Sequence, residues 1–129
     1  GKHIALLSFG TLLPAALSAA QTLDATLIDM RFIKPLDKHI ILKYAKTHAL
    51  LVTLEENTII GGAGSSVNQV ILQAGLQNQV LNLGLPDEFG THDTHEALLA
   101  HYGLDAAGII HSIKTVKGKQ DNDAKSLHA

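Results

Sequence analysis

A glycine-rich turn is the first feature of the sequence that could carry chemistry. Residues 61–66 read Gly-Gly-Ala-Gly-Ser-Ser and open a run with helical spacing of its apolar residues. Such a turn exposes backbone N–H groups and the positive end of a helix, which can bind phosphate. The run fits neither standard nucleotide motif, because Val67 stands where a third glycine is needed and no Gly-Lys-Ser/Thr follows. We therefore favour glycines that let the helix approach the sheet or a neighbouring chain closely.

Two adjacent carboxylates, Glu55 and Glu56, precede Asn57 at the end of a predicted strand. Neighbouring side chains on a strand point to opposite faces, so one carboxylate can enter a cleft while the other faces solvent. A carboxylate in a cleft can act as a general acid or base. No histidine or second carboxylate stands at a spacing that would complete such a site. A role in a turn and in hydrogen bonding is therefore favoured.

The eight histidines are the third group of candidates, concentrated at His92, His95, His101 and His111. The spacing His92-x-x-His95 superficially resembles that of metal ligands. No cysteine supports a metal site and the segment is polar, so we expect a solvated, histidine-rich surface. His48 ends a predicted helix, where histidine favours the negative helix pole. No nucleophile stands with a base and an orienting acid, so the residues predict no catalytic triad.

Length and composition limit the kinds of protein that remain. A chain of 129 residues with 46% hydrophobic residues and a net charge of −2 predicts one domain with a core, and excludes extensive disorder. The balance of 10 basic and 12 acidic residues gives no footprint for nucleic acid. No run approaches the ~18 apolar residues that a membrane helix requires.

Two further counts indicate that the chain has partners. Its charged residues make up 17%, below the usual ~25%, so we expect an apolar surface that meets another domain or chain. The chain begins with Gly1 and holds one methionine, Met30, so we expect it to be part of a longer polypeptide. The absence of cysteine excludes disulfides and fits a cytosolic location.

Strands and helices are predicted to alternate along the chain. Short apolar runs predict strands at residues 3–9, 25–30, 49–54 and 79–83. Apolar residues at helical spacing predict helices that begin near residues 11, 37, 61, 93 and 105. This alternation predicts right-handed crossovers and a three-layer α/β/α fold, with a mainly parallel four-stranded sheet in the order 2-1-3-4. We expect one domain over residues 1–117 and a polar, disordered tail over residues 118–129.

Five segments, in their order and at their intervals, resemble one enzyme family. They read SFGT at 8–11, DMRFIKPLD at 29–37, TLEENTIIGGAGS at 53–65, VLNLGLPD at 80–87 and GLDAAG at 103–108. Together they resemble the C-terminal, third domain of the 1-deoxy-D-xylulose-5-phosphate synthases, members of the transketolase superfamily. The resemblance covers about residues 2–117. It implies a fold like that of the transketolase C-terminal domain.

The resemblance implies a transferase that joins pyruvate to glyceraldehyde 3-phosphate with loss of CO₂. The product, 1-deoxy-D-xylulose 5-phosphate, supplies isoprenoid, thiamine and pyridoxal synthesis. The family uses thiamine diphosphate with Mg²⁺, and the cofactor supplies the carbanion chemistry. The cofactor motif and the activating glutamate of the family lie in two upstream domains. We therefore expect this chain alone to be inactive, to bind neither cofactor nor metal, and to contain no catalytic residue.

The resemblance also implies partners. These are the enzyme's own N-terminal and central domains and, in the full-length enzyme, the second subunit of a homodimer in the bacterial cytoplasm; neither nucleic acid nor a membrane is expected. The family domain usually carries an antiparallel edge strand upstream of Gly1, without which one sheet edge lacks a partner strand. We expect an interdomain or dimer-facing surface made of Glu55, Glu56, Asn57, Gly61, Gly62 and Gly64.

Two alternatives stay open at this point. One is the equivalent domain of a relative, such as transketolase or the β subunit of pyruvate dehydrogenase; residues 29–37 and 103–108 favour the synthase over it. The other is a free-standing α/β module that binds a small ligand or a partner. The segment EFGTHDTH at 88–95 differs from the family's Phe-Ile-Pro-Gln-Gly type of run, so no role is transferred to this loop.

Overall fold

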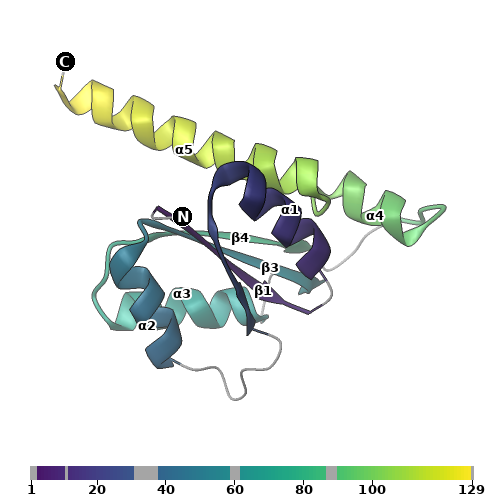
Figure 1. Cartoon of the computed structure of the whole chain (residues 1–129), viewed down its shortest axis with the longest axis horizontal. Helices are drawn as coiled ribbons and strands as arrows, with labels where there is room; N and C mark the ends of the chain where they lie inside the picture. Colours follow the sequence, from purple (N-terminus) through teal and green to yellow (C-terminus); the bar gives the residue numbers. More distant parts are fainter. Residues whose placement is uncertain (1–2, 11, 31–37, 59–61, 87–89, 129) are drawn as a thin grey trace.

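The computed structural model describes residues 3–10, 12–30, 38–58, 62–86 and 90–128, with the backbone alone at residues 57–58 and 120–128 (Figure 1). Within these residues, strands and helices alternate as the sequence predicts. They are β1 (Ile4–Phe9), α1 (Leu13–Leu23), β2 (Thr26–Asp29), α2 (Lys38–Thr47), β3 (Leu50–Thr58), α3 (Ala63–Gln73), β4 (Gln79–Leu85), α4 (His95–His101) and α5 (Ala106–His128).

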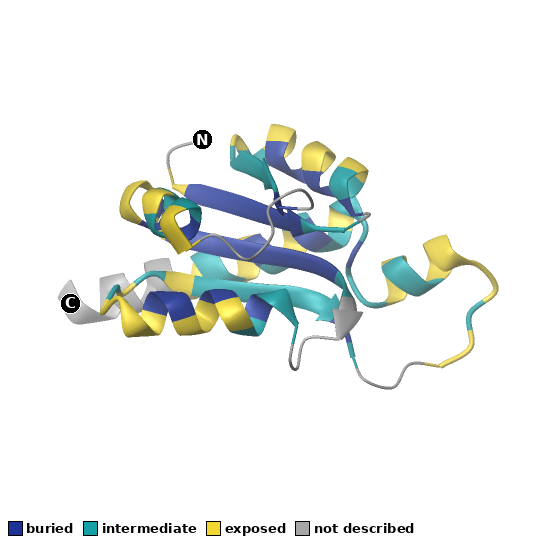
Figure 2. Ribbon diagram, turned by 90° about the horizontal axis from the view of Figure 1, so that it is seen from below, coloured by how far each residue is buried: buried dark blue, intermediate teal, exposed yellow. Residues whose placement is uncertain are grey.

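The four strands form one parallel sheet in the order β2-β1-β3-β4, which confirms the predicted fold and strand order. Helices α1 and α5 cover one face of the sheet, and α2 and α3 cover the other (Figure 1). The inner strands are apolar on both faces because each face meets a helix layer. Figure 2 shows this difference: β1 and β3 are buried along most of their length, whereas β2 and β4 at the edges are half-buried.

The core consists of two apolar clusters, one on each face of the sheet. Alternation along β1 sends Ile4 and Leu6 to the cluster beneath α1 and α5, and Ala5 and Leu7 to the cluster beneath α2 and α3. Alanines of α1, at positions 16, 19 and 20, are buried and bring this helix close to the sheet. Both faces of a short sheet are therefore covered by this chain alone.

Some element ends differ from the sequence prediction. Strand β3 continues through the two glutamates to Thr58, and α5 continues to His128, where we expected a disordered tail from residue 118. Residues 118–128 contain no proline, the residue that most strongly interrupts a helix. Gly103 follows Tyr102, the C-cap residue of α4, with a φ of +70°, the left-handed conformation that glycine commonly adopts after a helix. Within the described residues, no helix combines the length and apolar character that a membrane crossing requires.

Candidate functional site

The carboxyl ends of β1 and β3 form the switch point of the sheet. The chain leaves β1 toward α1 on one face and leaves β3 toward α3 on the other, so the two connections diverge (Figure 1). In open α/β sheets, ligands and partners bind outside this point. Two segments singled out in the sequence meet here, the end of β1 and the Glu55-Glu56 pair of β3, because Phe9 and Glu55 are register partners.

Glu55 is buried at the switch point and caps the start of α3. Its side chain is 3% exposed and lies on the sheet face covered by α2 and α3. The carboxylate Oε2 accepts a hydrogen bond from the backbone N–H of Ala63 at 3.0 Å, and Oε1 accepts one from Gly64 at 3.2 Å. A carboxylate in this place compensates both the free N–H groups and the positive pole of the helix. The predicted hydrogen-bonding role of Glu55 is confirmed.

This contact also decides what the glycine-rich turn does. The two N–H groups that a phosphate would use at α3 already donate to the side chain of Glu55. Gly62 is the N-cap residue, in extended conformation and half-buried. Gly61 lies outside the described residues. The negatively charged group at the start of α3 is therefore the carboxylate of Glu55, and not a bound phosphate.

Gly64 is buried where α3 meets the sheet. A Cβ atom on Gly64 would lie 2.8 Å from both Asn82 Oδ1 and Thr53 Oγ1. These two atoms are themselves paired, since the hydroxyl of Thr53 donates to Asn82 Oδ1 at 2.7 Å across β3 and β4. No side chain larger than hydrogen fits this place without a shift of the polar pair. The prediction that glycine permits close approach to the sheet is confirmed at Gly64.

Glu56 points away from Glu55, as the alternation along a strand predicts. Its Oε1 lies 3.3 Å from His95 Nε2, with side-chain exposures of 28% for Glu56 and 62% for His95. The contact joins the end of β3 to the first residue of α4. The side chain of Asn57, next in the chain, lies outside the described residues. The paired glutamates thus divide into one buried carboxylate and one accessible carboxylate.

The rings of His92 and His101 pack against each other and against Tyr102, in tilted and edge-to-face arrangements. The ring centroids of His92 and His101 are 4.9 Å apart, and those of His101 and Tyr102 are 4.8 Å apart. His95 and His101 are exposed and His92 is half-buried. Among the residues that the structure describes, no three histidine, cysteine, aspartate or glutamate side chains lie together as metal ligands. In the described part of the chain, no third metal-ligating side chain joins His92 and His95.

At the opposite end of the sheet, His48 ties the end of α2 to its surroundings. The residue is 7% exposed; its Nδ1 lies 3.0 Å from the carbonyl oxygen of Tyr44 and its Nε2 lies 2.9 Å from Thr26 Oγ1. Since a carbonyl only accepts, the contact with Tyr44 assigns the proton of the neutral ring to Nδ1. The sequence predicted the position at a helix end but not the bond to β2.

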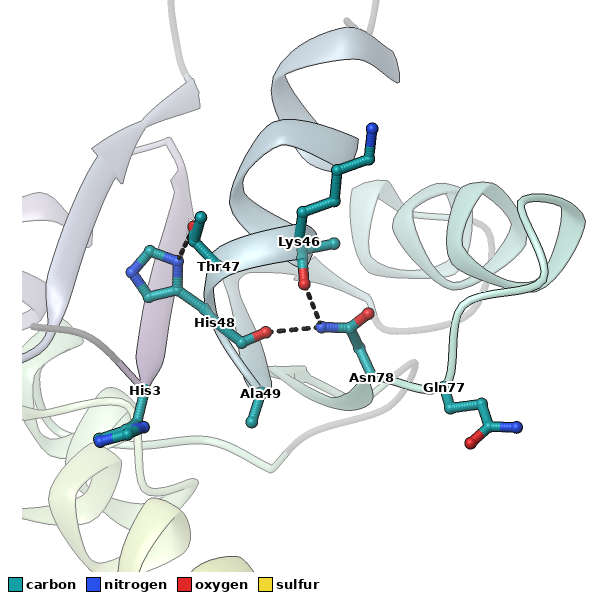
Figure 3. A pocket seen from close by; sticks show the side chains of 8 residues that line it. His3, Lys46, Thr47, His48, Ala49, Gln77 and Asn78 are labelled. Atoms are coloured by element: carbon teal, nitrogen blue, oxygen red, sulfur yellow. Dashed lines mark hydrogen bonds between the residues drawn. The ribbon is translucent and has the colours of Figure 1, made fainter.

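Asn78 completes this arrangement from the loop before β4. Its amide Nδ2 donates to the carbonyl of Ala45 at 2.8 Å and to that of His48 at 2.6 Å (Figure 3). The two bonds supply donors to carbonyls at the end of α2, which have no partner within the helix. A cavity of about 510 Å³ opens beside them, bordered by His3 and Lys46. Sequence reasoning missed Asn78, because a lone asparagine in a polar loop carries no signal of its partners.

The chain matches the model of a known domain family. The matching family is described as the transketolase C-terminal domain, and the match covers residues 1–109. The 1-deoxy-D-xylulose-5-phosphate synthase of Proteus mirabilis is 60% identical over 114 residues, which cover 88% of this chain and 18% of that protein. The synthase of Bordetella avium is 55% identical over the same shares. The chain thus spans about a fifth of the length of these relatives.

A solved structure shows the same fold. The structure titled "Split gene transketolase, inactive beta4 tetramer" superposes with a TM-score of 0.79 and 32% sequence identity, over 89% of this chain and 39% of that one. The strand order, the two helix layers and the family match agree with one another. The chain belongs to the transketolase C-terminal domain family.

Proposed function

We propose that this chain is the C-terminal domain of a bacterial 1-deoxy-D-xylulose-5-phosphate synthase, a transferase that joins pyruvate to glyceraldehyde 3-phosphate with loss of CO₂. One observation carries the proposal: synthases match 88% of the chain at up to 60% identity. The solved transketolase, which represents one alternative left open by the sequence, is 32% identical. By the same argument we propose a homodimer in the bacterial cytoplasm, with thiamine diphosphate and Mg²⁺ bound elsewhere in the full enzyme.

The described residues do not fit that cofactor. A diphosphate needs free N–H donors and ligands for the Mg²⁺ that accompanies it. At the glycine-rich turn the donors of Ala63 and Gly64 are taken by Glu55. No group of three metal-ligating side chains lies together in the described part of the chain. We therefore assign no step of the reaction to this chain and propose a structural role for it.

The surface that serves this role is, in our proposal, the end of β3 with the turn before α3. Glu56 and Gly62 are half-buried there, while Glu55 and Gly64, close to them in the sequence, are buried. Asn57 and Gly61 join the surface by their place in the sequence. The proposal is supported by the position of this surface at the switch point, and by a charged fraction of only 17%. The related transketolase structure is titled a β4 tetramer, which supports contacts between copies.

A chimeric enzyme tests the proposal. Residues 2–117 of this chain would replace the matching C-terminal region of the Proteus mirabilis synthase, and CO₂ release from pyruvate plus glyceraldehyde 3-phosphate would be followed. The controls are the intact synthase, a version truncated before this region, and a chimera that carries the split-gene transketolase domain. We expect the chimera to be active, and the truncated and transketolase-domain versions to lose activity.

Other outcomes would overturn one part of the proposal each. A folded but inactive chimera would contradict the assignment to the synthase. Full activity of the truncated enzyme would contradict a required structural role and would move the domain to assembly or regulation. Equal activity of the transketolase-domain chimera would show that any member of the domain family serves, and would leave the assignment to the synthase unsupported.

A further inference from the structure

Helix α4 is poorly covered by the rest of the chain. It contains no buried residue, whereas every other helix has at least two among its described residues (Figure 2). Its sequence at 97–100 is nevertheless Ala-Leu-Leu-Ala. Leu98 and Leu99 are half-buried against the core, and Ala97 and Ala100 are exposed. A helix as short as this one depends on packing for its stability, so its uncovered apolar side favours a further partner.

A groove lies between α4 and the start of α1. It is a cavity of about 650 Å³, and its apolar lining comes from both helices and from the loop after α4. Leu12 and Leu104 in this lining are buried, whereas Pro14, Ala97 and Ala100 are exposed. Apolar hollows are the places where a partner protein anchors its own apolar side chains. The groove can therefore receive an apolar side chain from another domain.

The charged residues that border the groove are acidic. Among the described residues they are Glu96 and Asp105, and no lysine, arginine or histidine of the described chain lines the groove with them. Glu96 is exposed; Asp105 is half-buried, and its Oδ1 accepts a hydrogen bond from the N–H of Gly108 at 2.8 Å. A carboxylate retains further acceptor sites after one such bond. Because interfaces match charges of opposite sign, the groove favours a partner with a lysine or arginine beside its apolar side chain.

The groove continues the surface proposed at the end of β3. The Oε1 atom of Glu56, which belongs to that surface, lies 3.3 Å from Nε2 of His95, the first residue of α4. Glu96, the next residue, borders the groove. Figure 1 shows α4 beyond the end of the sheet, at the side where α1 begins. A domain that packs on the end of β3 is therefore placed next to the groove.

We infer that the groove binds a segment of the preceding domains of the full-length enzyme, in which a lysine or arginine flanks an apolar side chain. The inference rests on the proposed function and names the chemistry of the partner at its surface. Most of the Proteus mirabilis synthase lies outside the matched region, since this chain covers 18% of it. A segment of the same polypeptide is held at a high effective concentration, so a small, open groove is sufficient to bind it.

Hydrogen–deuterium exchange of α4 tests the inference. The amides of residues 97–101 are compared between the 129-residue chain alone and the chimeric synthase that carries residues 2–117. We expect these amides to exchange at least about tenfold more slowly in the chimera, because a covered helix opens less often. The amides of α2, on the other face of the sheet, are the internal control and should change by less than about twofold.

Two alanine variants locate the contact. Ala100→Arg places a large cation in the groove, and Glu96, four residues earlier, supplies a favourable helix pair that keeps α4 folded. We expect the slowing of α4 in the chimera to fall below about twofold in this variant. Ala74→Arg is the matched control, because it adds the same side chain at an exposed residue, the C-cap of α3. It should retain the slowing, and equal slowing in the two variants would overturn the groove as the contact.

A change of charge tests the chemistry of the partner. Glu96→Gln removes one negative charge from the edge of the groove and is expected to reduce the slowing about threefold, the effect of losing one exposed ion pair. Gln73→Lys, which changes the net charge by the same amount at an exposed position of α3, should leave the slowing intact. Equal slowing in these two variants would overturn the lysine or arginine of the partner segment.

The CO₂ release of the same chimera separates this inference from the proposed function. An active chimera with unchanged exchange of α4 would overturn the groove alone. An inactive chimera in which α4 is slowed would overturn the synthase assignment and support the groove, and an inactive chimera without slowing would overturn both. Exchange of α4 that slows in the isolated chain as its concentration rises would overturn the inference, because the occupant would then be a second copy.

Discussion

Glu55 Oε1 lies 3.2 Å from the backbone nitrogen of Gly64, so a side chain at the end of β3 closes the start of α3. Together with the second bond, to Ala63, this contact binds both ends of the connection between strand and helix. The two N–H groups at this helix start and the buried carboxylate satisfy each other. These bonds hold the start of α3 in place next to the end of β3. A neighbouring domain would therefore meet a preformed surface there.

We predict that Glu55→Gln destabilises the chain by about 2 kcal/mol, because a buried amide in this place loses the charge and turns its NH₂ group toward a backbone donor. The free energy of unfolding in urea measures the effect. Glu56→Gln is the matched control; its side chain is accessible, and a change within about 0.5 kcal/mol is expected. A Glu55→Gln chain as stable as the wild type would contradict the capping role.

Glycine-to-alanine substitutions at two helix positions are predicted to have opposite signs. Gly64→Ala places a Cβ 2.8 Å from Asn82 Oδ1 and from Thr53 Oγ1, so we expect a loss of about 1–3 kcal/mol from overpacking. Gly118→Ala in α5 meets no atom within 4 Å and should stabilise by about 0.5–1 kcal/mol, because alanine is the better helix former. Thermal unfolding of both variants gives the comparison. A stabilising Gly64→Ala would show that the polar pair moves freely.

The hydrogen bonds at the end of α2 predict that substitution of the buried His48 strongly lowers the stability of the chain. His48→Ala removes the contacts with Thr26 and Tyr44 and is expected to cost about 2–4 kcal/mol of unfolding free energy. His111→Ala, at an exposed position of α5, should stay within about 0.5 kcal/mol. Equal effects of the two substitutions would contradict the structural role of His48.

A double-mutant cycle extends this prediction to Asn78. Asn78→Ala leaves the carbonyls of Ala45 and His48 without their donor and is expected to cost about 1–3 kcal/mol. Because the two residues act on the same helix end, we expect their effects to be non-additive by about 0.5–3 kcal/mol. Strict additivity would show that His48 and Asn78 stabilise α2 independently.

The sheet could be predicted from the sequence because its strands are short continuous apolar runs separated by helical spacing. The period of two also predicted that the two glutamates would separate. It could not say which one goes inside, since residues 50–54 are buried on both faces and give no sign of orientation. The hydrogen bonds from Ala63 and Gly64 to Glu55 show that Glu55 is the buried glutamate. They depend on the position of the start of α3 relative to β3, which the sequence does not give.

Contacts between segments that are distant in the sequence could not be predicted, for a similar reason. The pair of Thr53 and Asn82 depends on the register of β3 with β4, and the bonds of Asn78 depend on a loop that returns to the end of α2. Among the described residues the buried hydroxyl of Ser8 has no hydrogen-bond partner, which the sequence likewise could not indicate. Local propensity carries no information on such partners, so residue type alone left them open.

A substitution of Glu56 tests the proposed interface without disturbing the fold, because its side chain is accessible. Glu56→Lys reverses a charge at the end of β3, where its Oε1 lies 3.3 Å from His95 Nε2. An exposed pair of this kind contributes at most about 1 kcal/mol to stability, so the isolated chain should remain folded. In the chimeric synthase, the reversed charge would lie against a neighbouring domain or subunit, where a mismatched charge costs several kcal/mol. We therefore expect at least about a tenfold loss of CO₂ release with the chain's own stability nearly unchanged.

Gln73→Lys is the matched control for this last prediction. It adds the same positive side chain at an exposed position at the other end of α3, far along the helix from the turn that follows β3. A cation near a helix C-terminus is mildly favourable, so both stability and activity should be retained. If Glu56→Lys and Gln73→Lys chimeras release CO₂ equally fast, the end of β3 does not meet another domain, and the surface must lie elsewhere on the chain. Loss of activity in Glu56→Lys alone would place the contact at the switch point, because both variants carry an added lysine and only that of Glu56→Lys lies there.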